Sequence, residues 1–352
     1  MTASTWLVRR RRAVTAAGVG VVLVALVLFP AVGDAFSVFV ATRILVLGLF
    51  AVAYNVVFGY GGMPSLGHAA FFGIGGYAVG IGVTRLGWTL PTVVIAALAL
   101  GAAAGAVFGL FCLRVRGVYV LLLTLALSQA LFGFAFFQTD FTGGDNGIPG
   151  IPRTGLPEPL RGAEGYYLLT LGVVAAALAV LWLFQHSPVG MAIVGMRESE
   201  ARMSATGYRV DVLRVVAFTV SGAFGAIAGM LEVYLQGSVS PANLSWLVGA
   251  EVMVFTILGG ARRFLGPFLG AAAVTVLEVW VSTYTERWTT VLGILYIITA
   301  VFLPDGVLGR LAWAGRRMRL QDRSAPADTS APTGSAQAAG KDGAGSAAEA
   351  RR

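Results

Sequence analysis

Residues 55–77 read NVVFGYGGMPSLGHAAFFGIGGY, and this stretch decides how the fold is interpreted. It lies within a long apolar region, yet it is rich in glycine and carries Pro64, Ser65 and His68. Glycine is entropically costly in a helix and proline lacks a backbone donor, so we predict a helix break at residues 59–64. Broken backbone at membrane depth is tolerated only where protein buries it or where it lines a wet cavity.

The composition indicates that the surrounding chain does lie in a membrane. Of its 352 residues, 57% are hydrophobic and only 12% are charged, and the mean hydropathy is +0.79. A soluble fold of this length could not cover so much apolar surface. We therefore predict an all-α, polytopic integral membrane protein built as a helical bundle.

The apolar runs give the number of predicted spans. A hydrocarbon core about 30 Å thick needs roughly 20 helical residues at about 1.5 Å each. The run that follows Arg9 to Arg12 is longer than the apolar region of a signal peptide, so we interpret it as a retained span. The ten candidates are residues 13–32, 36–58, 66–84, 88–112, 117–137, 166–184, 212–236, 246–261, 265–284 and 288–303.

Arginine positions predict the orientation of these spans. With the amino terminus inside the cell, most arginines fall in cytoplasmic segments, as the positive-inside rule requires. Both termini are then cytoplasmic: a basic segment at 1–12 and a tail at 310–352 whose Ala, Gly, Ser and Pro content predicts disorder. The predicted membrane domain covers 13–309, with a Gly- and Pro-rich outer loop at 138–165 and a charged cytoplasmic loop at 185–211.

Several function classes are excluded by the residue types. The net charge of +8 comes from charges at the ends of apolar runs, which argues against a nucleic-acid partner. Lys341 is the only lysine and lies in the predicted tail, so there is no phosphate-binding loop for ATP hydrolysis. Cys112 is the only cysteine, which excludes an intrachain disulfide or a cysteine-based metal site. We expect no catalytic residues, no cofactor and no metal.

Two sets of residues are candidates for function. The first follows the predicted break, where the glycines should let a neighbouring helix approach and Ser65, His68 and Phe72 share a helix face. His68 is interpreted either as a satisfied interior histidine or as a group that meets solute. The second is the charged cytoplasmic loop, predicted as a short amphipathic helix with an apolar stripe of Val194, Ala201 and Ala205. Such a helix could bind a soluble partner or lie at the lipid headgroups.

Ionisable residues inside the spans are Arg43, Glu232, Glu251 and Glu278. Each costs roughly 2.5 to 3.5 kcal/mol at the bilayer centre on insertion scales. Glu232 and Glu251 fall near span ends, where exposure is cheap. Glu278 is the one candidate for a midplane acid, and the sequence names no partner for it. An ion-coupled transporter that uses Glu278 or His68 as a proton relay stays open as an alternative, as does a passive channel.

Taken together, these motifs resemble the permease subunits of branched-chain amino acid ABC transporters, the LivH/LivM family, and the LivM-like branch most closely. The resemblance covers residues 44–309. It rests on the stretch 55–77, on RGVY at 116–119 with TLA at 124–126, on TGGDNG at 142–147, on residues 190–207, on Gly266 and Pro267 with Gly270, and on Pro304 with Gly306 and Gly309.

The resemblance implies a type II ABC importer permease in a bacterial cytoplasmic membrane. Its implied partners are the lipid bilayer, a second homologous permease, two cytoplasmic ATP-binding subunits that hydrolyse the ATP, and an extracytoplasmic solute-binding protein. It implies transport of branched-chain, hydrophobic amino acids, although relatives of this type also serve urea and short amides. Arg202, Met203, Arg262, Arg263 and Asp305 depart from the residues usual in the family.

Site residues are assigned on the same basis. The translocation path is assigned to Asn55, Gly59, Gly61, Gly62, Ser65, His68, Tyr119 and Thr124. The loop that couples to the ATP-binding subunits is assigned to Gly190, Arg197, Glu198, Glu200 and Gly207. The loop that faces the binding protein is assigned to Thr142, Gly143, Gly144, Asp145 and Asn146.

Overall fold

The computed structural model describes residues 24–153, 156–285, 290, 293–294 and 297, and the description below is confined to them. The described chain is helical throughout and holds no β-strand; a single bridge pairs Ile148 with Val239. Its helices are η1 (Phe29–Ala31), α2 (Ala35–Asn55), η2 (Val56–Tyr60), α3 (His68–Leu86), α4 (Leu90–Phe111), η3 (Cys112–Arg114), α5 (Val118–Phe137), α6 (Thr139–Thr142), η4 (Gly144–Asn146), η6 (Glu158–Leu160), α7 (Ala163–His186), α8 (Pro188–Glu198), α9 (Glu200–Ala205), α10 (Val210–Gln236), η7 (Pro241–Leu244), α11 (Trp246–Gly259) and α12 (Gly266–Tyr284).

Seven of these helices are long and apolar enough to cross a membrane. They match seven of the predicted spans within a few residues at each end: Ala35–Tyr60, His68–Leu86, Leu90–Arg114, Val118–Phe137, Ala163–His186, Val210–Gln236 and Gly266–Tyr284. The prediction of an all-α, multi-pass membrane bundle is therefore confirmed. The predicted spans 13–32 and 288–303 fall mostly outside the described residues, as do the segments 1–12 and 310–352, so these two spans stay predictions.

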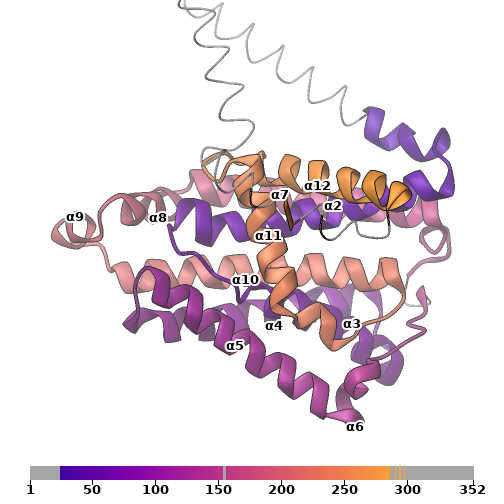
Figure 1. Cartoon of the computed structure of the whole chain (residues 1–352), viewed down its shortest axis with the longest axis horizontal. Coiled ribbons are helices and arrows are strands. Elements are labelled where there is room, and N and C mark those ends of the chain that lie inside the picture. Colours follow the sequence, from indigo (N-terminus) through magenta and orange to yellow (C-terminus); the bar gives the residue numbers. More distant parts are fainter. Residues whose placement is uncertain (1–23, 154–155, 286–289, 291–292, 295–296, 298–352) are drawn as a thin grey trace, which may run out of the picture. The chain divides into compact units, whose positions relative to one another are not determined.

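The predicted span 246–261 is wrong as a full crossing. Helix α11 has 14 residues, which is about 21 Å against a core of about 30 Å. The chain enters this helix from inside the bundle, because Leu244 of η7 is buried and a Cβ on Gly73 of α3 would lie 2.3 Å from its side chain. Ser128 of α5 donates to the Leu244 carbonyl at 3.2 Å. Figure 1 shows α11 running steeply across the neighbouring helices.

Helix α10 is the centre of the packing, with extensive contacts to α2, α3 and α4. Its contact with α4 is made backbone to backbone. A Cβ added at Gly105 would lie 2.3 Å from the Phe218 carbonyl oxygen, and one at Gly101 would lie 2.5 Å from the Gly222 carbonyl oxygen. Gly75 of α3 meets α10 in the same way at Ala226. Small residues at four-residue spacing allow this close approach, as in other membrane helix pairs.

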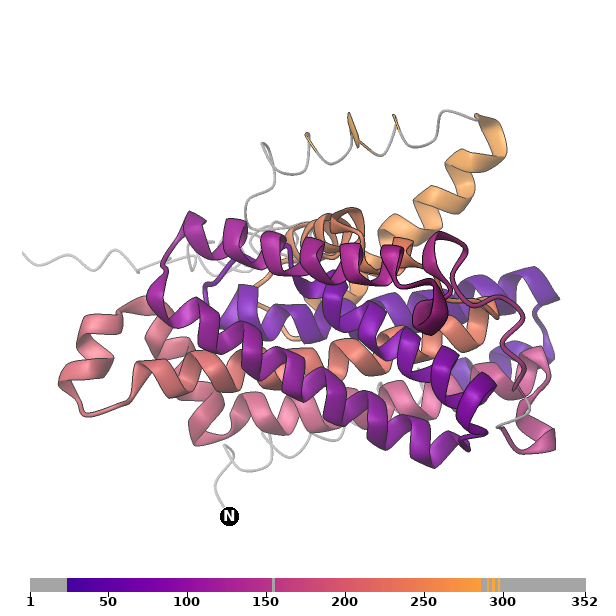
Figure 2. The same cartoon turned by 90° about the horizontal axis from the view of Figure 1, so that it is seen from below.

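The two long loops lie at opposite ends of the bundle. Helices α8 and α9 project at one end and α6 lies at the other, as Figures 1 and 2 show from two directions. The end with α8 and α9 also carries Arg116 and Arg214, both paired with Glu200. At the other end the Arg85 side chain donates to the Asp140 carbonyl. Arg116 and Arg214 thus lie at one end of the bundle and Arg85 at the other.

Candidate functional site

The predicted break follows α2. Helix α2 passes into a π-helical turn, η2. Residues 61–67 after it are not helical, and α3 begins at His68. π-Turns are rare and occur mostly at functional sites. Gly62 has φ +69°, a conformation that favours glycine. Gly59 has no room for a side chain, since a Cβ there would lie 2.0 Å from the Ala261 carbonyl oxygen.

A reversal between α11 and α12 closes around the end of α2. Asn55 Nδ2 donates to the Arg263 carbonyl at 3.2 Å. The reversal itself is tight, because a Cβ at Gly259 would lie 1.8 Å from the Gly266 carbonyl oxygen. This tight turn packs against the helix break, since the Ala261 carbonyl lies beside Gly59.

His68 is the centre of a closed polar network within the bundle. Its side chain is fully buried. Nδ1 lies 3.0 Å from Ser65 Oγ and Nε2 lies 2.9 Å from Ser221 Oγ on α10. Ser221 Oγ donates to the Ala53 carbonyl of α2 at 2.6 Å. We call Ala53, Ser65, His68 and Ser221 the interior network; it joins α2, α3 and α10.

Proton accounting fixes the tautomer of this ring. The single proton of Ser221 goes to the Ala53 carbonyl, so Ser221 Oγ must accept from His68 Nε2–H. Nδ1 is then the acceptor and takes the proton of Ser65, whose oxygen accepts from the Gly67 backbone N–H at 3.2 Å. Every polar atom of the neutral ring is satisfied, and none faces open space. His68 therefore braces the segment after the break.

Two further residues assigned to the path lie on α5, and their environments differ. Thr124 is buried, accepts from the Leu66 backbone N–H at 3.3 Å and lies against Gly67. Tyr119 is 70% exposed on the outer surface of the same helix. The structure brings Thr124 to the broken segment and leaves Tyr119 away from it.

The charged loop at 185–211 holds two helices, so the predicted single amphipathic helix is wrong. Ser187 and Ser199 cap α8 and α9, since their side chains accept from the backbone N–H of Gly190 and Arg202, respectively. Serine favours such a cap and therefore interrupts the run at Ser199. The buried face is Ala192, Ile193 and Met196 of α8, whereas Ala201 and Ala205 of the predicted stripe are exposed.

Charged side chains of the loop contact the membrane helices themselves. The Arg197 guanidinium donates to the Gly59 carbonyl at the end of η2. Glu200 Oε1 accepts from Arg214 at the start of α10, and Oε2 lies 3.4 Å from Arg116 Nε, just before α5. Burial lowers the pKa of Arg197 from its ordinary value, and the positive charge of Arg262 lowers it further.

A polar cavity of about 210 Å³ joins the break to the loop. Its walls include Gly61 and Gly62 from the break together with Arg197, Glu198 and Glu200 from the loop. Residues assigned on sequence to two different roles thus line one cavity. Gly190 and Gly207 lie at the two ends of the loop; Gly207 has φ +89°, and a Cβ at Gly190 would lie 2.3 Å from the Phe184 carbonyl oxygen.

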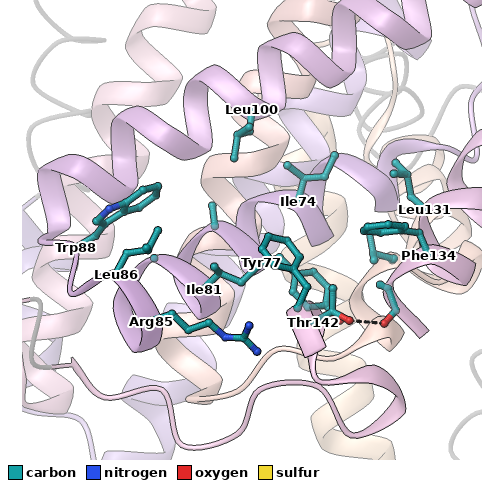
Figure 3. Close-up of a pocket in the computed structure, with 15 residues that line it drawn as sticks. Ile74, Tyr77, Ile81, Arg85, Leu86, Trp88, Leu100, Leu131, Phe134 and Thr142 are labelled. Atoms are coloured by element: carbon teal, nitrogen blue, oxygen red, sulfur yellow. Dashed lines mark hydrogen bonds between the residues drawn. The ribbon is translucent and has the colours of Figure 1, made fainter. Parts of the chain in front are cut away.

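A larger, apolar cavity of about 480 Å³ lies toward the other end, between α3, α4 and α5. Figure 3 shows aliphatic and aromatic side chains around it, with the Arg85 guanidinium at one edge. Thr142 is the one residue of the assigned outer set that lines it; its Oγ1 donates to the Ala135 carbonyl at 2.6 Å. Gly143 and Gly144 turn the chain with positive φ, and Asp145 and Asn146 are exposed.

The charges inside the bundle are better partnered than the sequence indicates. Glu278 of α12 forms an ion pair with Arg43 of α2 at 3.4 Å, a partner that the sequence does not identify. Glu232 is only 4% exposed and accepts from Gln236 at 2.8 Å, so its expected exposure at a span end is wrong.

Sequence reasoning missed three residues of the site: Ser221, Arg214 and Arg116. Ser221 is a small polar residue in a glycine-rich run of α10 and carries no local signal for a partner 153 positions away. Arg214 could have been noticed, because an arginine one turn into a long apolar helix must find an anion or carbonyl. Arg116 was recognised only as part of a motif.

These features define a class: a multi-pass membrane protein whose interior helix is broken beside a charged loop. The family comparison is more specific. Residues 36–301 match the family model described as branched-chain amino acid transport system, permease component, and the chain belongs to this family. It is a membrane permease of the kind found in ABC importers.

Individual relatives agree with the family. The chain is 29% identical over 310 residues to the high-affinity branched-chain amino acid transport system permease protein LivM of Salmonella typhimurium, covering 81% of this chain and 73% of LivM. It is 23% identical to LivH of Escherichia coli K12, covering 74% and 91%. It is also 28% identical to the autoinducer 2 import system permease protein LsrC of Enterobacter sp. strain 638, covering 67% and 69%. No solved structure gives a significant match.

Proposed function

We propose that this chain is one of two permease subunits of an ATP-driven importer for branched-chain, hydrophobic amino acids in a bacterial cytoplasmic membrane. Its partners are a second, homologous permease, two cytoplasmic ATP-binding subunits and an extracytoplasmic solute-binding protein. The ATP-binding subunits dock on the loop of α8 and α9, and the binding protein meets the exposed residues Asp145 and Asn146. The break after α2 belongs to the translocation path.

One observation carries this proposal beyond the family assignment: the polar cavity that Gly61 and Gly62 share with Arg197, Glu198 and Glu200. A soluble subunit that moves the loop would act directly on the broken segment. Broken helices at the transport site are a recurring device by which transporters rock around a fixed point. The substrate assignment follows the names of the LivM and LivH relatives.

An ion-coupled transporter is the less favoured alternative. Its two candidate relay groups are engaged elsewhere, since Glu278 pairs with Arg43 and His68 has its ring nitrogens occupied by serines. The substrate alternatives are urea or short amides, and the LsrC relative extends the range of solutes. Binding assays with the proposed solute-binding protein separate these solutes.

The test of the path assignment is Gly62→Leu. Its Cβ would lie 2.7 Å from the Arg197 side chain at a backbone φ of +69°, so the new side chain must push the loop away from the break. We expect ATP-dependent uptake in proteoliposomes to be abolished, with membrane insertion intact.

Gly87→Leu is the matched control for this variant. Gly87 has φ +62° but nothing within 4 Å of a Cβ, so it carries the same backbone strain of about 1 to 2 kcal/mol without the clash. Unchanged uptake in Gly62→Leu would remove the break from the path.

A further inference from the structure

The charged side chains of the cytoplasmic loop divide into two groups. Arg197 and Glu200 turn toward the membrane helices and find partners there. Glu198 and Arg202 are exposed, and among the described residues neither forms an ion pair. Arg197 is exposed as well, and Glu198 also lines the polar cavity, so the two groups differ in their partners within the described chain and not in exposure.

The Arg197 contact ties the loop to the end of α2. The last carbonyls of a helix lack backbone partners and carry partial negative charge, so a guanidinium is a favourable ligand for them. Arg197 supplies it at Gly59, within the π-turn. The aliphatic part of the same side chain lies against Gly62, where it would meet a Cβ at 2.7 Å. A single residue thus contacts both the end of the π-turn and the broken segment that follows it.

The Glu200 contact ties the loop to α5 and α10. Its two carboxylate oxygens have different partners, Arg214 and Arg116. The Arg214 side chain is only 4% exposed and also donates to the Leu113 carbonyl at 3.4 Å. Removing the carboxylate would leave a buried charge without its counter-ion, which is strongly unfavourable. Arg116 is 78% exposed and adds a weaker, screened contact.

From these contacts we propose that Arg197 and Glu200 are positioning residues that fasten the loop to the cytoplasmic ends of α2, α5 and α10. We call Gly59, Arg116, Arg197, Glu200 and Arg214 the loop clamp. Docking of the ATP-binding subunits falls to Glu198 and Arg202, the exposed charges of the loop that form no ion pair with the described residues. This inference rests on the proposed function. It divides the assigned coupling residues into two kinds: Glu198 receives the movement of the ATP-binding subunits, whereas Arg197 and Glu200 transmit that movement to the membrane helices.

The test compares two carboxylates two positions apart, Glu200→Gln and Glu198→Gln, in the assembled transporter. Three quantities are measured: retention of the ATP-binding subunits on purification, solute imported per ATP hydrolysed, and hydrogen exchange of the backbone amides at residues 56–63. For Glu200→Gln we expect retention within about twofold of the unaltered chain, with exchange at the break about tenfold faster and import per ATP about tenfold lower.

Glu198→Gln should show the opposite pattern, with weaker retention and unaltered exchange at residues 56–63. Arg116→Gln keeps the ion pair between Arg214 and Glu200 and therefore provides a clamp variant that folds. Hydrogen exchange at residues 56–63 should rise by less in this variant than in Glu200→Gln. Loss of retention in Glu200→Gln with unaltered exchange would overturn the inference. If the unaltered chain retains no ATP-binding subunit, the proposed function fails, while the exchange data still decide whether Glu200 holds the loop to the break.

Discussion

The interior network around His68 and the loop clamp around Glu200 both join α2 to α10, but at different depths. The interior network is fully buried, and each hydroxyl and ring nitrogen in it has a partner. The loop clamp borders a polar cavity and is partly exposed at Arg116 and Glu200. Buried, satisfied networks rigidify a structure, whereas partly hydrated ion pairs are weaker and exchange partners easily. We therefore expect the interior network to be rigid and the loop clamp to move.

The largest expected effect concerns the packing beneath the interior network. In Gly105→Leu the new Cβ would lie 2.3 Å from the Phe218 carbonyl oxygen. The backbones of α4 and α10 would have to move apart to make room, which would open the contact between these two helices. We expect a loss of at least about 3 kcal/mol in the free energy of unfolding and little folded protein. Thermal unfolding in detergent measures it. Gly172→Leu on the exposed face of α7, where a Cβ meets nothing within 4 Å, should unfold normally.

His68→Leu tests the rigid half of the comparison. The variant leaves the hydroxyls of Ser65 and Ser221 without their ring partner, at a cost of about 2 to 3 kcal/mol in the free energy of unfolding. Uptake per folded molecule should change little, because the ring is fully buried and both of its nitrogens are bonded to serines. A variant that keeps its stability but loses uptake would mean that His68 meets the solute and that the network is not merely a brace.

Glu278→Gln has a smaller expected effect and adds a third polar contact to the comparison. Its partner Arg43 keeps 27% of its side chain exposed, so the lost ion pair should cost only about 1 to 2 kcal/mol. Uptake should persist at the same pH dependence as in the unaltered chain. Abolished uptake with unchanged stability would favour a proton relay through Glu278 and contradict the ATP-driven account.

The smallest stability effect is expected at the outer end. Asp145 is exposed, so Asp145→Ala should alter the free energy of unfolding by less than about 0.5 kcal/mol. ATP hydrolysis stimulated by the solute-binding protein should nevertheless fall. Glu158→Gln, in the same loop and also exposed, is the matched control and should leave that stimulation intact. Equal results for the two variants would remove Asp145 from the docking surface.

Local signals in the sequence predicted most of the helices and the break. The spans follow from apolar length, and the break follows from glycines and Pro64, because both depend on residues close in the chain. Helix α11 was taken for a full crossing because hydropathy reports how apolar a run is and not how the chain enters it. The entry of η7 between α3 and α5 is set by Gly73 and Ser128, which lie far away in sequence.

The site was less predictable for the same physical reason. Assigning residues 190–207 to one helix missed the competition from Ser199, whose hydroxyl caps α9. The partners of His68 and Glu278 are 153 and 235 positions away, and a buried polar group finds its partner only when the tertiary packing brings the two together. Sequence thus indicates which groups need partners but does not identify those partners.

The central claim is that separate ATP-binding subunits drive this chain through its cytoplasmic loop. The most direct test is solute accumulation in proteoliposomes that contain the permease pair, with and without the ATP-binding subunits. We predict accumulation only when those subunits and ATP are present, and none from a pH gradient alone. Accumulation by the permease pair under a pH gradient, with no ATP-binding subunit, would contradict the account.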